Sequence, residues 1–237
     1  MQKSVWSGGH TQPVLCLDHN VDDILVSGGE DGIVSLWSSD GIPQSKISVA
    51  FGDNFDVNCV CFCRKESKSL YVSCGRKIFM FDIRNFSSPV WQLEHNKDEI
   101  NQITLNDKSS FLAAADDSGE IQIFELPSAK PFKTLSRRHT DICCCVQYRP
   151  QRPWEILSGG MDYNIFNWDF SSGRTLCQVN VQGLRKSCGN TKANNYNVNP
   201  PFVNSINVAS DSRRFACGLG KEGKFFNPPK GCKEGRG

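Results

Sequence analysis

A short sequence pattern is repeated along the chain, and this repeat limits the possible folds more than any other feature. It runs Leu-Val-Ser-Gly-Gly-Glu-Asp-Gly-Ile-Val-Ser-Leu-Trp at 25–37 and returns as Ile-Leu-Ser-Gly-Gly-Met-Asp-Tyr-Asn-Ile-Phe-Asn-Trp at 156–168, with looser copies at 112–124 and 70–81. The aromatic residues that close the copies are 44, 43 and 44 residues apart. A period of about 40–45 residues predicts one four-stranded propeller blade for each copy. These closing residues are Trp37, Phe81, Phe124 and Trp168.

Within each copy the residue pattern is that of a β-hairpin. In the first copy a short apolar run meets a turn of Gly, Glu, Asp and Gly, and an alternating strand follows at 33–37. Glycine permits the positive φ of a tight turn, and aspartate bonds to nearby backbone amides.

A histidine precedes three of the copies. His10, His95 and His139 lie 27, 29 and 29 residues before the closing aromatic residue. Another strand is expected after each histidine, at 14–17, 100–105 and 143–148. These strands are the innermost ones if the copies are blades.

Together these residues resemble the WD-repeat β-propeller family. The resemblance implies that a His, a Ser, an Asp and a Trp form a buried hydrogen-bonded relay within a blade, which fixes one arrangement of the chain. Two copies carry the full set, whereas the second copy has Arg76-Lys77 in place of the turn Asp and the third has Ala114 for the Ser and Ser118 for the Asp. The two full sets are His10, Ser27, Asp31 and Trp37, and His139, Ser158, Asp162 and Trp168.

The fold class expected is all-β, a propeller with four full four-stranded blades and a partial fifth in an open arc. Residues 1–181 hold the four blades, 182–201 form a polar Asn-rich insertion, 202–223 begin a fifth blade that breaks at Lys224, and 224–237 form an aberrant disordered tail. Closed WD-repeat rings usually have about seven blades, within a general range of 4–8, so we interpret the chain as truncated. Segments 6–17, 115–123 and 148–153 carry a narrower resemblance within the family, over about residues 4–223.

The twelve cysteines need a separate interpretation. No pair has the C-x-x-C spacing, and the two densest groups lie in apolar segments at 59–63 and 143–145. Free cysteine behaves as a small buried hydrophobic residue, so we expect thiols that pack within strands. The alternative is a metal or redox role.

The charge and hydropathy of the chain exclude several classes of protein. Twenty-seven basic and 25 acidic residues give a net charge of +2, which does not indicate an electrostatic nucleic-acid binder. No apolar stretch is long enough for a membrane span, and residues 1–10 lack the apolar region of a signal peptide. We expect a protein of the cytoplasm or nucleus whose partners are proteins.

Three functions from different classes remain open. Phe81-Asp82-Ile83-Arg84 is similar to the W-D-x-R box by which many WD-repeat substrate receptors dock onto the propeller adaptor of cullin-4 ubiquitin ligases. The alternative is a generic peptide-binding or chromatin-associated scaffold with a basic and aromatic patch at Arg137-Arg138 and 149–154. A thiol or zinc enzyme is the third. No catalytic, cofactor or metal-binding residue is predicted, since the set of Ser, His and Asp occurs in more than one copy, which a catalytic triad does not need, and no motif of an enzyme is present.

Overall fold

The computed structural model describes residues 5–49, 55–182, 200–220 and 223–226. These residues form four four-stranded antiparallel sheets and one three-stranded sheet, and each strand pairs with the next one along the chain. We number the sheets one to five in chain order. The fold is all-β, as the repeat predicts, apart from one turn of 3₁₀ helix, η1 (Ile83–Asn85).

The strands of the five sheets follow the repeat copies closely. Sheet one holds β1 (Val14–His19), β2 (Leu25–Gly29), β3 (Ile33–Trp37) and β4 (Pro43–Ser48). Sheet two holds β5 (Cys59–Phe62), β6 (Ser69–Cys74), β7 (Lys77–Asp82) and β8 (Trp91–Glu94). Sheet three holds β9 (Ile100–Leu105), β10 (Phe111–Asp116), β11 (Ile121–Glu125) and β12 (Lys130–Leu135). Sheet four holds β13 (Cys143–Tyr148), β14 (Glu155–Gly160), β15 (Asn164–Asp169) and β16 (Arg174–Asn180). Sheet five holds β17 (Val203–Val208), β18 (Phe215–Leu219) and β19 (Gly223–Phe226).

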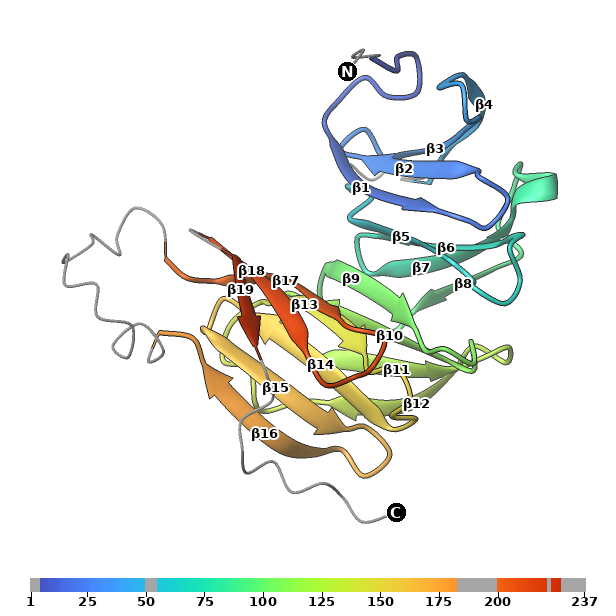
Figure 1. Ribbon diagram of the computed structural model, residues 1–237. Coiled ribbons are helices and arrows are strands. Elements are labelled where there is room, and N and C mark those ends of the chain that lie inside the picture. Colours follow the sequence, from blue (N-terminus) through green and yellow to red (C-terminus); the bar gives the residue numbers. More distant parts are fainter. Residues whose placement is uncertain (1–4, 50–54, 183–199, 221–222, 227–237) are drawn as a thin grey trace.

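The sheets succeed one another around an arc (Figure 1). The first strands β1, β5, β9, β13 and β17 contact their neighbours in turn and form the inner side of the arc. Among the residues described, the arc stays open between sheet one and sheet five.

The hydrophobic core is divided among the boundaries between sheets. One cluster of buried side chains lies at each of the four boundaries. Strand β10 shows how one strand serves two of them: Leu112 and Ala114 face sheet two, while Ala113 and Ala115 face sheet four. Successive side chains of a strand point to opposite faces, so a sheet between two others is apolar on both faces.

One boundary of the expected segments, at Lys224, lies within the described residues. Residues 183–199 of the Asn-rich insertion and 227–237 of the tail lie outside the described residues. The fifth sheet does not break at Lys224, because β19 continues to Phe226, where Phe225 and Phe226 pair with Ala216 and Phe215. The prolines that oppose strand pairing come only after this strand, at 228 and 229.

Three cysteines lie where one inner strand meets the next. The thiols of Cys16, Cys59 and Cys145 donate to backbone carbonyls of the following sheet, at Val57 (3.3 Å), Ile103 (3.5 Å) and Val203 (3.6 Å). A small polarizable side chain fits between two closely packed strands.

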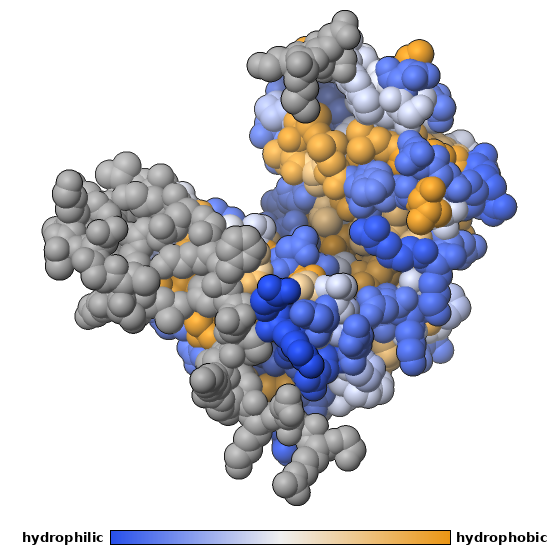
Figure 2. Space-filling view, viewed as in Figure 1, coloured by the Kyte–Doolittle hydropathy of each residue, from blue (hydrophilic) through white to orange (hydrophobic). Residues whose placement is uncertain are grey.

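Strand β1, at one end of the arc, keeps large apolar side chains exposed. These are Val14, Leu15 and Leu17. Figure 2 shows hydrophobic residues gathered over sheet one.

Candidate functional site

The full relay of sheet four joins four side chains that are distant in sequence. The Trp168 indole N–H donates to the Ser158 hydroxyl (2.9 Å), and this hydroxyl lies 2.8 Å from Nε2 of His139. Nδ1 of His139 lies 3.1 Å from each carboxylate oxygen of Asp162. The structure therefore brings together all four predicted relay residues of this copy.

The relay of sheet one repeats the same geometry. Trp37 donates to Ser27 across 2.7 Å, Ser27 lies 2.6 Å from Nε2 of His10, and Nδ1 of His10 lies 3.0 Å from Asp31. Both copies hold the aspartate at the turn between the second and third strands of the sheet.

The tryptophan and the aspartate at the two ends of the relay indicate which group donates each hydrogen bond between them. Indole nitrogen only donates and an ionised carboxylate only accepts. We therefore assign a neutral histidine with its proton on Nδ1, so that serine donates to Nε2 and histidine donates to aspartate. In this arrangement every member has a partner.

The carboxyl groups of the relay stay ionised despite their burial. Burial acts to raise the pKa of Asp162, but hydrogen bonds from His139 and from the amide and side chain of Asn164 outweigh it, and the pKa lies below its ordinary value. The pKa of Asp31 is lowered in the same way, by His10 and by the backbone amide of Thr11.

Each residue of the Ser-Gly-Gly triplet in the repeat has a different structural role. In sheet four Ser158 is the centre of the relay, and Gly159 faces the next sheet: a Cβ there would lie 2.3 Å from Cγ1 of Val203. A Cβ at Gly160 would lie 2.9 Å from Nδ1 of His139, so only glycine leaves room for the ring. Burial, close packing and the relay together therefore explain the most recognisable part of the repeat.

The relay has the spacing of a Ser-His-Asp catalytic triad, and burial separates the two interpretations. Nucleophile, base and orienting carboxylate lie within hydrogen-bond reach in both. Ser158 is 0% exposed, however, and its oxygen already accepts the Trp168 N–H. A substrate carbonyl has no access to this hydroxyl.

Sheet three replaces the relay with a network that the spacing of the repeat did not predict. Asp116, fully buried, accepts from the side chain of Asn96 (3.0 Å) and from the hydroxyl of Ser118 (2.5 Å). Ser118 does hold the turn position expected for it, but the carboxylate comes from Asp116. In strand register Asp116 stands where sheet four has Gly160.

His95 is not part of this network. Its ring packs edge-on against Phe124, with centroids 6.0 Å apart. The side chain of Asp116 explains this, because it fills the place that glycine leaves open for histidine in sheets one and four. His95 thus precedes its copy at the same spacing as His139, but its ring packs on Phe124 instead of taking part in a relay.

Phe81, Asp82 and Arg84 lie together at the end of β7, on the rim of sheet two. Phe81 is fully buried and packs on Phe86, with ring centroids 5.2 Å apart. Asp82 caps η1 by accepting the amide of Arg84 (2.9 Å). Arg84 then folds back, with Nε 2.9 Å and Nη2 2.5 Å from the two carboxylate oxygens of Asp82.

This ion pair is exposed and preorganised. The side chains of Arg84 and Asp82 are 68% and 28% exposed. Hydrogen bonds from the side chain and backbone of Arg84 lower the pKa of Asp82 to about 2, so the pair is fully charged near neutral pH. Bidentate contact of this kind fixes the plane of the guanidinium group.

The ion pair and the relays lie on opposite rims of the arc. The amide of Ile83 donates to Lys68 in the turn between the first two strands of its sheet. The carboxylates of the relays lie at the turns between second and third strands, at the other ends of those strands. One rim is thus stiffened by relays, and the other carries the Asp82–Arg84 pair.

The basic and aromatic patch at 149–154 is less basic than its sequence indicates. Arg149 is engaged by Glu155 (2.5 Å) and by the backbone carbonyl of Ser212 in sheet five. Arg152 lies 3.8 Å from the other oxygen of Glu155. Trp154 remains exposed beside these arginines.

The two sheets with a full relay match a known repeat family. A family model described as "WD domain, G-beta repeat" matches residues 2–38 and 129–169, which cover most of sheet one and sheet four with their two full relays. The chain is a WD40-repeat protein. Its two best-formed WD40 repeats are thus those in which the sequence carries the complete relay.

Several curated proteins are similar to this WD40-repeat chain. A WD repeat-containing protein 53 homolog of Dictyostelium discoideum is 30% identical over 229 residues, which are 90% of this chain and 61% of that protein. The narrower resemblance carried by 6–17, 115–123 and 148–153 is to WD repeat-containing protein 53. Protein transport protein SEC31 of the same organism is 25% identical over 75% of this chain and 14% of its own length. A THO complex subunit 6 homolog of Danio rerio is 31% identical over 35% of this chain and 25% of its own length.

The described residues include no helix that could span a lipid bilayer. They also contain no group of three or more His, Cys, Asp or Glu side chains placed to hold a metal ion.

Proposed function

We propose that this WD40-repeat chain is a non-enzymatic interaction scaffold of the cytoplasm or nucleus that docks onto the propeller adaptor of a cullin-4 ubiquitin ligase. WD40-repeat proteins are in general protein-interaction scaffolds. The chain spans 61% of the length of the WD repeat-containing protein 53 homolog. A docking role for a whole protein of that length is therefore also a proposal.

The observation that carries the proposal is the exposed Asp82–Arg84 pair at the end of β7. The contacts of Arg84 with Asp82 use Nε and Nη2. No residue in the described part of the chain is seen to bond Nη1. A carboxylate or carbonyl of the adaptor would meet this remaining donor on a guanidinium group that is already oriented.

The first position of the box departs from the family pattern. Phe81 stands where the pattern has Trp, so the indole N–H is missing. Phe81 is nevertheless a buried aromatic anchor between Phe79 and Phe86. Phe81 therefore anchors the end of β7 by packing, without the hydrogen bond that an indole N–H would add.

Binding to the purified adaptor tests the proposal. We expect Arg84→Ala to weaken binding at least tenfold, because the guanidinium group is the proposed contact, and Arg84→Lys to recover little of it, because lysine lacks the planar fork. Arg76→Ala is the matched control: Arg76 is on the same sheet, exposed, and paired with Glu94 at 3.2 Å.

The alternative is a peptide-binding scaffold with no ligase role. It becomes the better proposal if Arg84→Ala and Arg76→Ala bind the adaptor as the unmodified chain does. Equal thermal unfolding midpoints of both variants would show that the comparison reports binding.

A further inference from the structure

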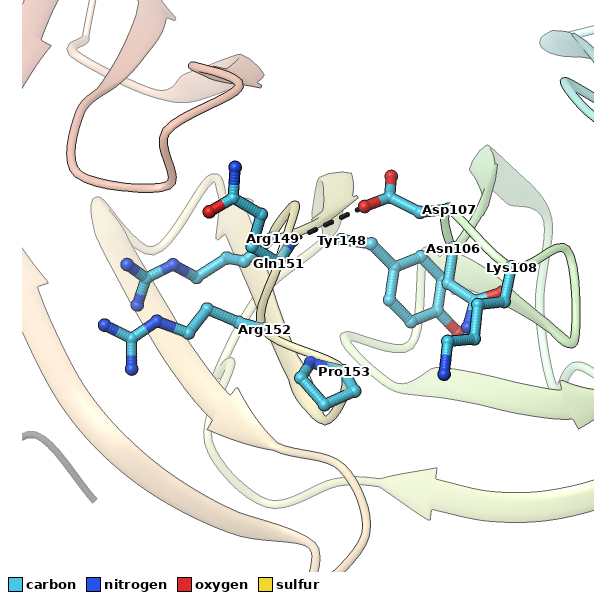
Figure 3. A pocket seen from close by; sticks show the side chains of 8 residues that line it. All are labelled: Asn106, Asp107, Lys108, Tyr148, Arg149, Gln151, Arg152 and Pro153. Carbon is cyan, nitrogen blue, oxygen red and sulfur yellow. Dashed lines mark hydrogen bonds between the residues drawn. The ribbon is translucent and has the colours of Figure 1, made fainter. Parts of the chain in front are cut away.

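A small pocket lies on the rim between sheets three and four. It is formed by the turn after β9 and the turn after β13, and its volume is about 280 Å³ (Figure 3). Sites for small-molecule ligands are usually about 300–1,000 Å³. A volume at this lower limit suits one amino-acid side chain rather than a nucleotide or a larger cofactor.

The pocket contains a buried hydroxyl group without a partner. Tyr148 is 5% exposed, and its ring packs edge-on against Phe170 with centroids 5.5 Å apart. Its hydroxyl has no hydrogen-bond partner among the described residues. Burying such a group unpaired is unfavourable, and native structures contain few of them. A ligand atom in the pocket would supply the missing partner.

Lys108 is the cation of this pocket. Figure 3 shows Lys108 and Tyr148 on the side of Asn106, whereas the guanidinium groups of Arg149 and Arg152 point the opposite way. The contacts of the two arginines with Glu155 agree with this orientation. Of the cationic groups lining the pocket, only the Lys108 ammonium is without an ion pair among the residues described.

The other polar groups of the lining are already used. Asn106 accepts the amides of Ser110 and Phe111, at 2.8 and 3.0 Å. Asp107 accepts the amide of Gln151 at 3.4 Å. The pocket thus offers one ammonium group and one phenolic hydroxyl.

We propose that this pocket binds the carboxylate side chain of an acidic peptide segment of a partner protein. An ammonium group and a phenol both donate hydrogen bonds, and a carboxylate accepts them on two oxygens. Asp107 at the rim disfavours a larger acidic cluster, so the pocket takes one carboxylate. The proposal does not depend on adaptor docking through Asp82 and Arg84.

An exposed aromatic surface beside the pocket favours a peptide as the ligand. Phe132 and Trp154 are 40% and 44% exposed and stack with centroids 6.5 Å apart. Trp154 follows Pro153, which lines the pocket, and it contacts Phe170 behind Tyr148. An apolar residue next to the carboxylate in a peptide would cover these rings, as aromatic anchors do in interfaces.

The test uses a fluorescein-labelled peptide, Ser-Gly-Phe-Glu-Leu-Gly-Ser, blocked at both ends, and its Glu→Gln counterpart. We expect the full chain to bind the Glu peptide at least fivefold more tightly than the Gln peptide by fluorescence polarisation. Tyr148→Phe and Lys108→Gln should each remove most of that preference. Lys65→Gln, on the corresponding turn of sheet two, is the matched control and should keep it.

Tyr148→Phe separates binding from folding. It removes only an unpartnered hydroxyl, so the unfolding midpoint should be unchanged or higher. Trp154→Ala should weaken both peptides equally, and free glutarate should compete only weakly. Equal binding of the two peptides, or a preference that survives Tyr148→Phe and Lys108→Gln, overturns the proposal. Competition by glutarate as strong as by the peptide would overturn the peptide as ligand.

Discussion

Gly159 faces Val203 across the boundary between sheets four and five, and a Cβ on this glycine would lie 2.3 Å from Cγ1 of the valine. Gly28 stands in the same relation to Val57 between sheets one and two, also at 2.3 Å. In both places the next atom that the Cβ would meet is a valine Cβ or the thiol of the inner strand. The sheets therefore approach each other through a glycine on one side and a β-branched residue on the other.

Gly159→Ala should destabilise the protein by about 1–3 kcal/mol, since overpacking of a tight boundary forces side chains or backbone to shift. The free energy of unfolding from urea titration measures this. Val203→Ala makes room for the new methyl group. The double variant should therefore lose less free energy of unfolding than the sum of the losses of the two single variants. Strict additivity of the two changes would contradict the contact.

The relay of sheet four gives a second prediction. Asp162→Ala should cost about 1–3 kcal/mol in the free energy of unfolding, because His139 loses its acceptor while buried. Asp40→Ala is the control, since Asp40 is exposed in the turn after β3. If both variants unfold at the same denaturant concentration, the relay does not stabilise this sheet.

The ionised carboxyl of the relay also predicts a pH dependence. Asp162 has a pKa below its ordinary value of 3.8 in the folded protein. A group with a lowered pKa contributes stability at pH values above the unfolded-state pKa, and this contribution is lost as pH falls through the folded-state pKa. The stability difference between the unmodified chain and Asp162→Asn should therefore be constant from about pH 7 to 5 and shrink below about pH 4. Thermal unfolding across this range is the measurement, and a constant difference down to pH 2.5 would count against it.

How far the sequence predicts the site depends on the sheet. In sheets one and four each relay residue is present at its usual spacing, so the four partners could be named from the sequence. In sheet three the spacing pointed to Ser118, whereas the buried carboxylate belongs to Asp116 two positions earlier. The signal was there: Asp116 occupies a glycine position of the repeat, and a side chain at that position excludes the histidine ring.

Contacts on the rim of the arc could not be predicted in the same way. The bond from Arg149 to the carbonyl of Ser212 joins residues of different repeats across a turn whose conformation the repeat does not specify. The pairing of Arg84 with Asp82 depends on the single turn η1. The repeat specifies strands and register, while these rim contacts depend on the individual turns.

The cysteines of the inner strands give a fourth prediction. Burial raises the pKa of Cys59 to about 11 and raises the pKa values of Cys61, Cys143 and Cys145 as well. A thiol with a raised pKa is rarely a thiolate and reacts slowly. These four residues should resist alkylation in the folded state and bind no stoichiometric zinc, as mass spectrometry before and after unfolding will show. Cys232, which lies outside the described residues, is expected to label at once.

The thiol-to-carbonyl contacts between neighbouring sheets also determine how this protein would respond to oxidative damage. Cys16, Cys59 and Cys145 each place sulfur within 3.3–3.6 Å of a backbone carbonyl of the next sheet, and an oxidised sulfur would no longer donate to that carbonyl. Oxidation of such a sulfur to a sulfinic acid would also bring a charge into an apolar boundary. A single oxidised sulfur would then separate two neighbouring sheets, while the strands within each sheet kept their hydrogen bonds.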